Sequence, residues 1–263
     1  MLYEPQRQHL ARIVDDLLAW EVLNPAGGAV SVRLPDGNVL MSCTRLAFDR
    51  WKVSVRDFVA LAPDGAIVEQ TGGLGASGTP THLDLYRMLP RAGAIVHAHA
   101  PYTLAFASLG LPVPSVTNRA DTFGEIPCLH ADDSTVKAGS LADPVSLDLP
   151  EGMVQRPDVA AVNLLAYRPQ LEEVIAPRAD ELKRHGLAFT LYRHGAFTVG
   201  RHLEETADLM LRLEETSRTA LLQAQLTGGT IYPNRLYRTE RRSHDGATTT
   251  TPVSSYLTRR DSI

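Results

Sequence analysis

The sequence predicts an α/β domain, because segments with helical and strand-like hydrophobic patterns alternate along most of its 263 residues. Two observations carry this prediction: short apolar runs divided by turn sequences in the first quarter of the chain, and amphipathic segments near both ends of residues 1–227. Hydrophobic residues make up 44% of the chain, which is enough for a sizeable core. We therefore expect residues 1–227 to form one domain.

The first expected element is a helix over residues 7–23, where apolar side chains recur at helical spacing among charged ones. Pro25 and the Gly27-Gly28 pair are expected to end it. Its apolar positions are Leu10, Ile13, Val14, Leu17, Leu18 and Val22.

An antiparallel meander is expected next, because four short β-branched or aliphatic runs are joined by Pro-Asp-Gly turn sequences. The runs are residues 29–34, 38–43, 57–62 and 66–69, and the turns are residues 35–37 and 63–65.

A second helix is expected over residues 79–89, with Thr79 as its N-cap and Pro80 at its first helical position. A short buried strand, residues 94–96, then leads directly into His97-Ala98-His99. This order places two histidines at the end of a strand.

The later elements follow the same alternation. A helix is expected over residues 102–109, and residues 187–199 are expected to form a strand, a turn and a second strand around Arg193-His194-Gly195. Residues 202–226 carry the longest helical pattern. Residues 138–157, rich in Pro, Asp and Ser, show no clear period and are interpreted as a loop or an insertion.

Residues 228–263 differ in composition from the rest of the chain. Gly228-Gly229 interrupts the helical pattern, and the segment that follows contains many arginines, the Thr248 to Thr251 tract and few residues large enough for a core. We interpret it as an Arg/Thr-rich C-terminal tail, either mobile or laid on a neighbouring subunit.

Composition excludes several classes of function. A formal charge of -4 and a pI near 6.1 provide no general attraction to nucleic acid or to anionic membranes. The N-terminus lacks a secretory signal pattern and no apolar run reaches the length of a membrane span, so a cytoplasmic protein is expected. Cys43 and Cys128 are expected to be thiols, because two cysteines cannot make a disulfide framework.

Three histidines are the strongest candidates for chemistry. Side chains alternate along a strand, so His97 and His99 point to the same side at the end of a rigid element. Such a pair can bind a metal ion through imidazole nitrogens with little further loss of entropy. His194 lies in a second strand and turn, where Gly195 leaves space for a ligand. The pattern predicts one divalent metal ion bound by His97, His99 and His194.

These segments resemble the class II aldolase/adducin family. The resemblance rests on Gly28 to Arg33, Thr81 to Tyr86, Ala94 to Tyr102 and Arg193 to Gly195 in that order, and it covers roughly residues 8 to 226. It implies a three-layer α/β/α sandwich with a central, mostly antiparallel sheet. It also implies that the three histidines bind zinc, with iron or manganese as alternatives, at a subunit interface of a homo-oligomer, commonly a tetramer.

The sequence departs from the sugar-phosphate aldolases of this family at the substrate loops. Their Ser-Ser-Glu segment, whose Glu is a metal-site ligand and acid/base, is matched here by Ala76-Ser77-Gly78. Their phosphate loops are matched by Gly28-Ala29 and Thr44-Arg45. Gly28, Thr44 and Ser77 remain candidates for substrate binding. Arg45 is either a clamp for a carboxylate or another anion, or a solvated turn residue.

Another branch, the methylthioribulose-phosphate dehydratases, also lacks the aldolase Glu and places a catalytic Glu where this chain has Asp121. Asp121 is therefore the first candidate for the general base, and a helix cap or turn is its alternative role. The further candidates are Glu125, Asp132 and Asp133. His130 stands near the family's proton-donating tyrosine and either replaces it or has no such role.

The resemblance implies a metal-dependent lyase acting on a small carbonyl-containing substrate through an enediolate or enolate. Loss of the aldolase Glu favours decarboxylation or dehydration over aldol cleavage. An alternative is a non-heme iron oxygenase on the same three histidines, acting on a 2-oxo or 2-hydroxy acid. A non-catalytic adducin-like module is disfavoured, because that branch is not expected to keep the metal histidines.

Overall fold

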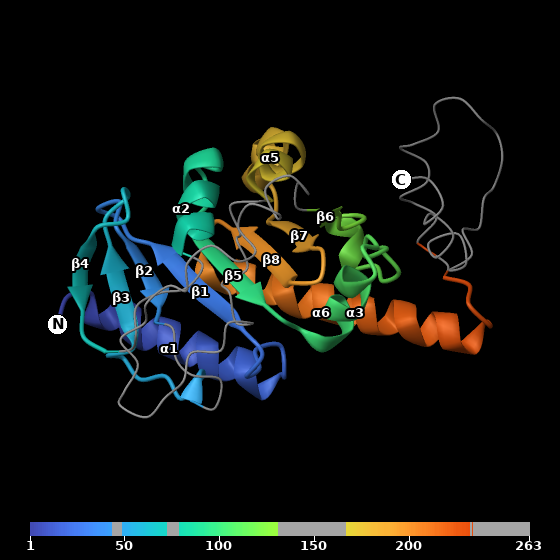
Figure 1. Ribbon diagram of the computed structural model, residues 1–263, viewed down its shortest axis with the longest axis horizontal. Helices are drawn as coiled ribbons and strands as arrows, with labels where there is room; N and C mark the ends of the chain where they lie inside the picture. The colour runs from blue at the N-terminus through green and yellow to red at the C-terminus, as the bar shows by residue number, and fades with distance from the viewer. Residues whose placement is uncertain (44–48, 73–78, 131–166, 232, 234–263) are drawn as a thin grey trace, which may run out of the picture.

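The computed structural model describes residues 1–43, 49–72, 79–130, 167–231 and 233. Its centre is an eight-stranded sheet in the order β4-β3-β2-β1-β5-β8-β7-β6. Neighbouring strands are antiparallel, except that β6 runs parallel to β7. The predicted fold class, a three-layer sandwich around a mostly antiparallel sheet, is confirmed (Figure 1).

The strands of the first half form the predicted meander and its continuation. They are β1 (Gly28–Arg33), β2 (Val39–Ser42), β3 (Phe58–Leu61), β4 (Ile67–Gln70) and β5 (Ala94–Ala98). The strands of the second half are β6 (Cys128–Leu129), β7 (Leu187–Leu191) and β8 (Gly195–Gly200). The runs that the sequence predicted as strands therefore all lie in one sheet.

Helices cover both faces of the sheet (Figure 1). One face packs against α1 (Glu4–Ala19), α3 (Pro101–Ser108) and α6 (Leu203–Leu226), and the other packs against α2 (Thr79–Met88) and a helical segment at residues 168–183. Each interface contains its own cluster of buried apolar side chains. No helix in the described ranges has the length and apolarity needed to cross a membrane.

Helix α1 begins and ends earlier than the periodicity predicts. It ends at Ala19, and Glu21 has a positive φ of 60°, so the chain reverses there. The backbone N–H groups of Val22 and Leu23 both donate to the carbonyl of Leu17, which folds these side chains back into the core. Val22 therefore continues the apolar pattern without belonging to the helix.

The segment at residues 168–183 was not predicted as helical. It passes from α5 (Arg168–Gln170) through a π turn, η5 (Leu171–Ile175), to a 3₁₀ turn, η6 (Ala176–Lys183). Pro177 lacks an N–H, so it cannot donate an α-helical hydrogen bond where η5 passes into η6. The short 3₁₀ element η2 (Ala120–Thr122) was not predicted either.

Two sequence predictions fall largely outside the described residues. The loop or insertion at residues 138–157 lies there, and so does the C-terminal tail beyond residue 233.

Candidate metal centre

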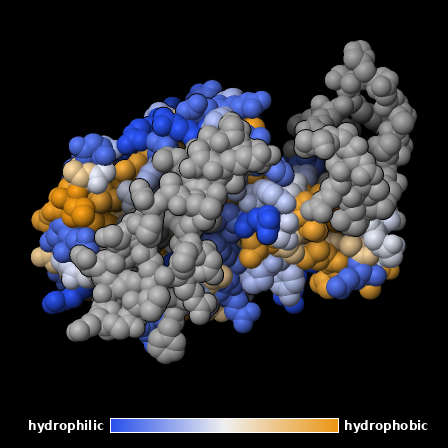
Figure 2. Space-filling model, viewed as in Figure 1, coloured by the Kyte–Doolittle hydropathy of each residue, from blue (hydrophilic) through white to orange (hydrophobic). Residues whose placement is uncertain are grey.

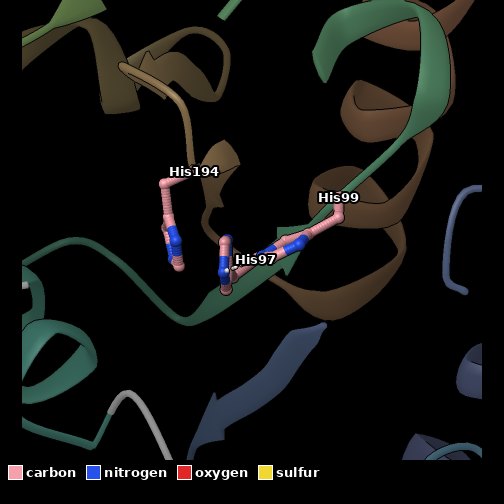
Figure 3. A group of neighbouring side chains, drawn as sticks. All are labelled: His97, His99 and His194. Atoms are coloured by element: carbon pink, nitrogen blue, oxygen red, sulfur yellow. Dashed lines mark hydrogen bonds between the residues drawn. The ribbon is translucent and has the colours of Figure 1, made fainter. Parts of the chain in front are cut away.

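Three histidines from two chain segments meet at one end of the central strands (Figure 3). His97 is in β5, His99 lies between β5 and α3, and His194 lies in the turn between β7 and β8. Because β5 pairs antiparallel with β8, the end of one strand lies beside the start of the other. One ligand nitrogen from each ring lies within 4.8 Å of the other two.

The backbone of β8 fixes the orientation and the tautomer of His97. Its Nδ1 lies 2.9 Å from the carbonyl oxygen of Ala196. A carbonyl only accepts hydrogen bonds, so Nδ1 carries the proton and Nε2 presents its lone pair. The ring also stacks on Phe197, its cross-strand neighbour, with centroids 4.1 Å apart. His97 is therefore held in the protonation state that a metal ligand requires.

The other two rings direct nitrogen atoms toward the same region. The Nε2 atoms of His97 and His99 lie 3.3 Å apart, close to the separation of about 3.4 Å expected for two nitrogens that bind one tetrahedral ion. Within the described part of the chain, the Nε2 atom of His194 is buried and has no hydrogen-bond partner. A buried polar atom without a partner is costly, and a metal bond would satisfy it. The residues fit a divalent ion.

The described residues add no carboxylate or thiol to this group. Among the His, Cys, Asp and Glu side chains of those residues, only His97, His99 and His194 lie close enough together here to share an ion. Three protein ligands leave coordination positions for substrate or water, which is the pattern of catalytic rather than structural zinc sites.

Glycines allow the close approach of chain and rings. A Cβ at Gly27 would lie 2.5 Å from Cε1 of His99, and a Cβ at Gly195 would lie 2.7 Å from the carbonyl oxygen of Ala98. Gly195 thus contributes space next to two ligands, as the sequence predicted.

Burial keeps the three imidazoles neutral. It lowers the pKa of His99 to about 4, with a further contribution from the positive charge of Arg50, and it lowers the pKa of His194 to about 4, with a further contribution from His99. The pKa of His97 falls well below its ordinary value, mainly through burial. Neutral imidazole is the form that binds metal.

These shifts predict that the metal-free protein loses stability as the pH falls. His99 and His194 take up protons near pH 6.5 in the unfolded chain, but only near pH 4 in the folded one. The unfolded state therefore binds more protons in this window, and the free energy of unfolding decreases between about pH 6.5 and 4. Urea unfolding of chelator-treated protein across this range measures the effect. An unfolding free energy that stays constant there would contradict it.

Hydrogen bonds connect His99 to the segment that follows residue 48. Asn24 Nδ2 donates to the carbonyl of His99 at 2.8 Å, and Trp51 Nε1 donates to the carbonyl of Asn24 at 2.7 Å. Trp51 is 7% exposed, so this connection is largely shielded from water. It places Arg50, next to Trp51, on the side of the site that His99 occupies.

Of the predicted substrate-binding residues, Gly28 lies beside the histidine group. Gly28 opens β1 opposite Ala98, and a Cβ there would lie 2.7 Å from the carbonyl oxygen of His97, so it borders the site. Thr44, Arg45 and Ser77 lie outside the described residues.

Neither predicted acid/base residue joins the histidine group through a described contact. Asp121 is half-buried in η2, where its Oδ1 accepts a hydrogen bond of 2.8 Å from Ser115. His130 is exposed and stacks on Tyr192, with centroids 4.9 Å apart. Asp132 and Asp133 lie outside the described residues, and Glu125 is half-buried. The roles of Asp121 and His130 stay predictions.

Sequence reasoning missed the groups that support the ligands. The Ala196 carbonyl belongs to the backbone, so the residue type carries no signal of its role. Phe197 could have been found, because a strand paired with β5 must place a side chain opposite His97. For Arg50 the only signal was the adjacent Trp51, a rare residue that tends to be anchored when buried.

Comparisons with known proteins identify a family and similar folds. Residues 8–221 match the family model described as Class II Aldolase and Adducin N-terminal domain. The L-ribulose-5-phosphate 4-epimerase UlaF of Salmonella paratyphi C (strain RKS4594) is 28% identical over 197 residues, which is 74% of each chain.

Two solved structures share the fold. YgbL from Escherichia coli superposes with a TM-score of 0.63 at 23% identity, over 92% of this chain and 100% of that one. L-fuculose-1-phosphate aldolase from Thermus thermophilus superposes with a TM-score of 0.57 at 21% identity, over 83% of this chain and 94% of that one.

Proposed function

Because the chain belongs to the class II aldolase and adducin N-terminal domain family, we propose that it is a divalent-metal-dependent lyase acting on a small carbonyl-containing substrate. The observation that carries the proposal is the convergence of three neutral imidazoles with no described carboxylate ligand beside them. A divalent ion held there supplies Lewis-acid polarisation of a carbonyl oxygen.

The chain's own residues prepare this site. The Ala196 carbonyl and the Phe197 ring hold His97 in one orientation, so that Nε2 points toward the other two ligands. Ligands fixed before substrate arrives cost little reorganisation during the reaction. His99 has to carry its proton on Nδ1 when its Nε2 serves as a ligand.

Within the lyases, decarboxylation or dehydration is favoured over aldol cleavage. The support for this choice is the sequence Ala76-Ser77-Gly78, where the aldolases of the family carry their catalytic Glu. The UlaF relative is named as an epimerase of a sugar phosphate, so a phosphorylated sugar belongs among the substrates to be tested. No finding here favours the oxygenase alternative.

We further propose zinc as the ion and a homotetramer as the assembly. The three-histidine donor set suits zinc, and iron or manganese would accept it as well. Assembly is supported by exposed apolar side chains on β4 and near the C-terminal end of α6 (Figure 2), among them Ile67 (62% exposed) and Leu226 (87% exposed).

The proposal is tested by metal analysis of protein purified without added metal, followed by a substrate screen of the zinc, manganese and iron forms. Sugar phosphates, 2-oxo acids and aromatic carboxylates are the classes to include. We expect about one ion per chain and turnover of one class, with sedimentation velocity reporting the assembly. A protein that binds none of the three ions would overturn the proposal.

Asp121→Asn tests the candidate base. A carboxylate that transfers a proton in the reaction should lose about 10² to 10⁴ in kcat on amidation, with metal content unchanged. Steady-state kinetics and metal analysis on the same preparation measure both. Near-normal kcat with a lowered Tm would instead show that Asp121 serves the turn through its hydrogen bond with Ser115.

A further inference from the structure

Arg50 is a positively charged side chain beside the histidine group with no anionic partner in the described residues. Its Nε atom is buried and makes no hydrogen bond there, and the ion pairs of those residues do not include it. The residue as a whole is half-buried. A buried guanidinium nitrogen without a hydrogen-bond partner is unfavourable, and a bound anion would supply that partner.

The position of Arg50 is fixed through its neighbour Trp51. The Trp51 indole donates to Asn24, and Asn24 in turn donates to the His99 carbonyl. Trp51 also lies against Gly28, whose Cβ would come within 3.0 Å of the indole ring. These contacts hold the segment against the metal site.

The carboxylates closest in sequence already have other partners. Asp49 forms an ion pair with Lys52 at 2.8 Å. Asp57 accepts hydrogen bonds from the backbone N–H and the hydroxyl of Ser54, at 2.8 and 2.7 Å. Both carboxylates therefore interact with other groups of the same segment.

The charges near the site also favour an anion bound next to Arg50. The hydrogen bonds of Trp51 and Asn24 place Arg50 on the side of the site that His99 occupies. A guanidinium next to a divalent ion would be repelled by it. An anion that lies between the two positive charges removes this repulsion.

We propose that Arg50 is a substrate-binding residue that holds an anionic group, a carboxylate or a phosphate, next to the metal ion. This inference rests on the proposed function and narrows its substrate to one that carries both a metal-chelating oxygen and a negative charge. The guanidinium fork matches both anions with two parallel hydrogen bonds. Arg50 is distinct from Arg45, the arginine that the sequence suggested for this role.

The test compares ligand binding to wild type and Arg50→Gln by calorimetry, with zinc-loaded and metal-free protein. Three small probes separate the chemistries: glycolate carries a carboxylate and a hydroxyl, inorganic phosphate is the second anion, and hydroxyacetone is uncharged. Lys52→Gln is the matched control, because it removes one positive charge from the same segment at an exposed ion pair. Arg50→Met removes the same charge and replaces Arg50→Gln in the experiment if the Gln variant has a lowered Tm.

Arg50→Gln should weaken binding of one anion by about 10- to 100-fold, the range for losing a charge-assisted pair of hydrogen bonds. Loss of glycolate binding alone identifies a carboxylate, and loss of phosphate binding alone identifies a phosphate. Lys52→Gln and the hydroxyacetone affinity should not change.

Equal affinity of wild type and both Arg50 variants for glycolate and for phosphate, or no binding of either by wild type, overturns the inference. The proposed function fails separately, through absence of bound metal. In that case the anion affinities of the metal-free protein still decide the role of Arg50.

Discussion

His97→Ala, His99→Ala and His194→Ala should each lose the bound metal ion and about 10³-fold or more in turnover, because Lewis-acid stabilisation contributes several kcal/mol. Each substitution removes one of only three described ligands. The two buried apolar clusters lie between the sheet and the helices, so the fold should persist without the ion. We therefore expect a loss of activity without unfolding.

Metal content after dialysis, circular dichroism and kinetics on one preparation measure these effects together. His202→Ala is the matched control, because this histidine is exposed at the start of α6, away from the three ligands. His97→Ala should show the largest fall in Tm, since its ring is buried and stacked on Phe197. Full metal occupancy in any one of the three variants would contradict the ligand assignment.

Much of the fold follows from local sequence patterns. The Pro-Asp-Gly turns predict the hairpins, because such turns fix the register of the strands that they join. The His97 and His99 pair was predictable from the alternation of side chains along a strand, although His99 lies one residue beyond the end of β5. The strand and turn around His194 indicated a third ligand, and the resemblance to a family supported its convergence with the pair. The pairing of β5 with β8 that brings it there is a long-range contact that no local pattern encodes.

The remaining features depend on tertiary context. The winding of residues 168–183 changes at Pro177, and the few apolar side chains that anchor it, such as Leu171 and Ile175, do not keep one helical period. Asp121 was selected because the resemblance to the dehydratase branch places a catalytic Glu at its position, but a matching position does not determine where a loop directs a side chain. In the structure, the Oδ1 atom of Asp121 accepts a hydrogen bond from Ser115.

Gly195→Ala should weaken metal binding by about 10- to 100-fold, comparable to losing a group that orients a ligand. The new Cβ would lie 2.7 Å from the Ala98 carbonyl oxygen, 2.9 Å from Cδ2 of His99 and 3.2 Å from Cε1 of His97. The carbonyl belongs to β5, where Ala98 pairs with Ala196, so it cannot move freely. The imidazole rings must therefore shift, and overpacking should also lower the free energy of unfolding by about 1 to 3 kcal/mol.

Competition with a chromophoric zinc chelator gives the affinity, and urea unfolding gives the stability. Gly37→Ala is the matched control: Gly37 has a φ of 90°, yet the nearest atom to its Cβ is Pro63 Cγ at 4.0 Å. It should lose stability through backbone strain while binding zinc normally. If Gly195→Ala bound zinc as tightly as wild type, the ligands would tolerate a methyl group at this position, and close packing would not be the reason for glycine beside His194.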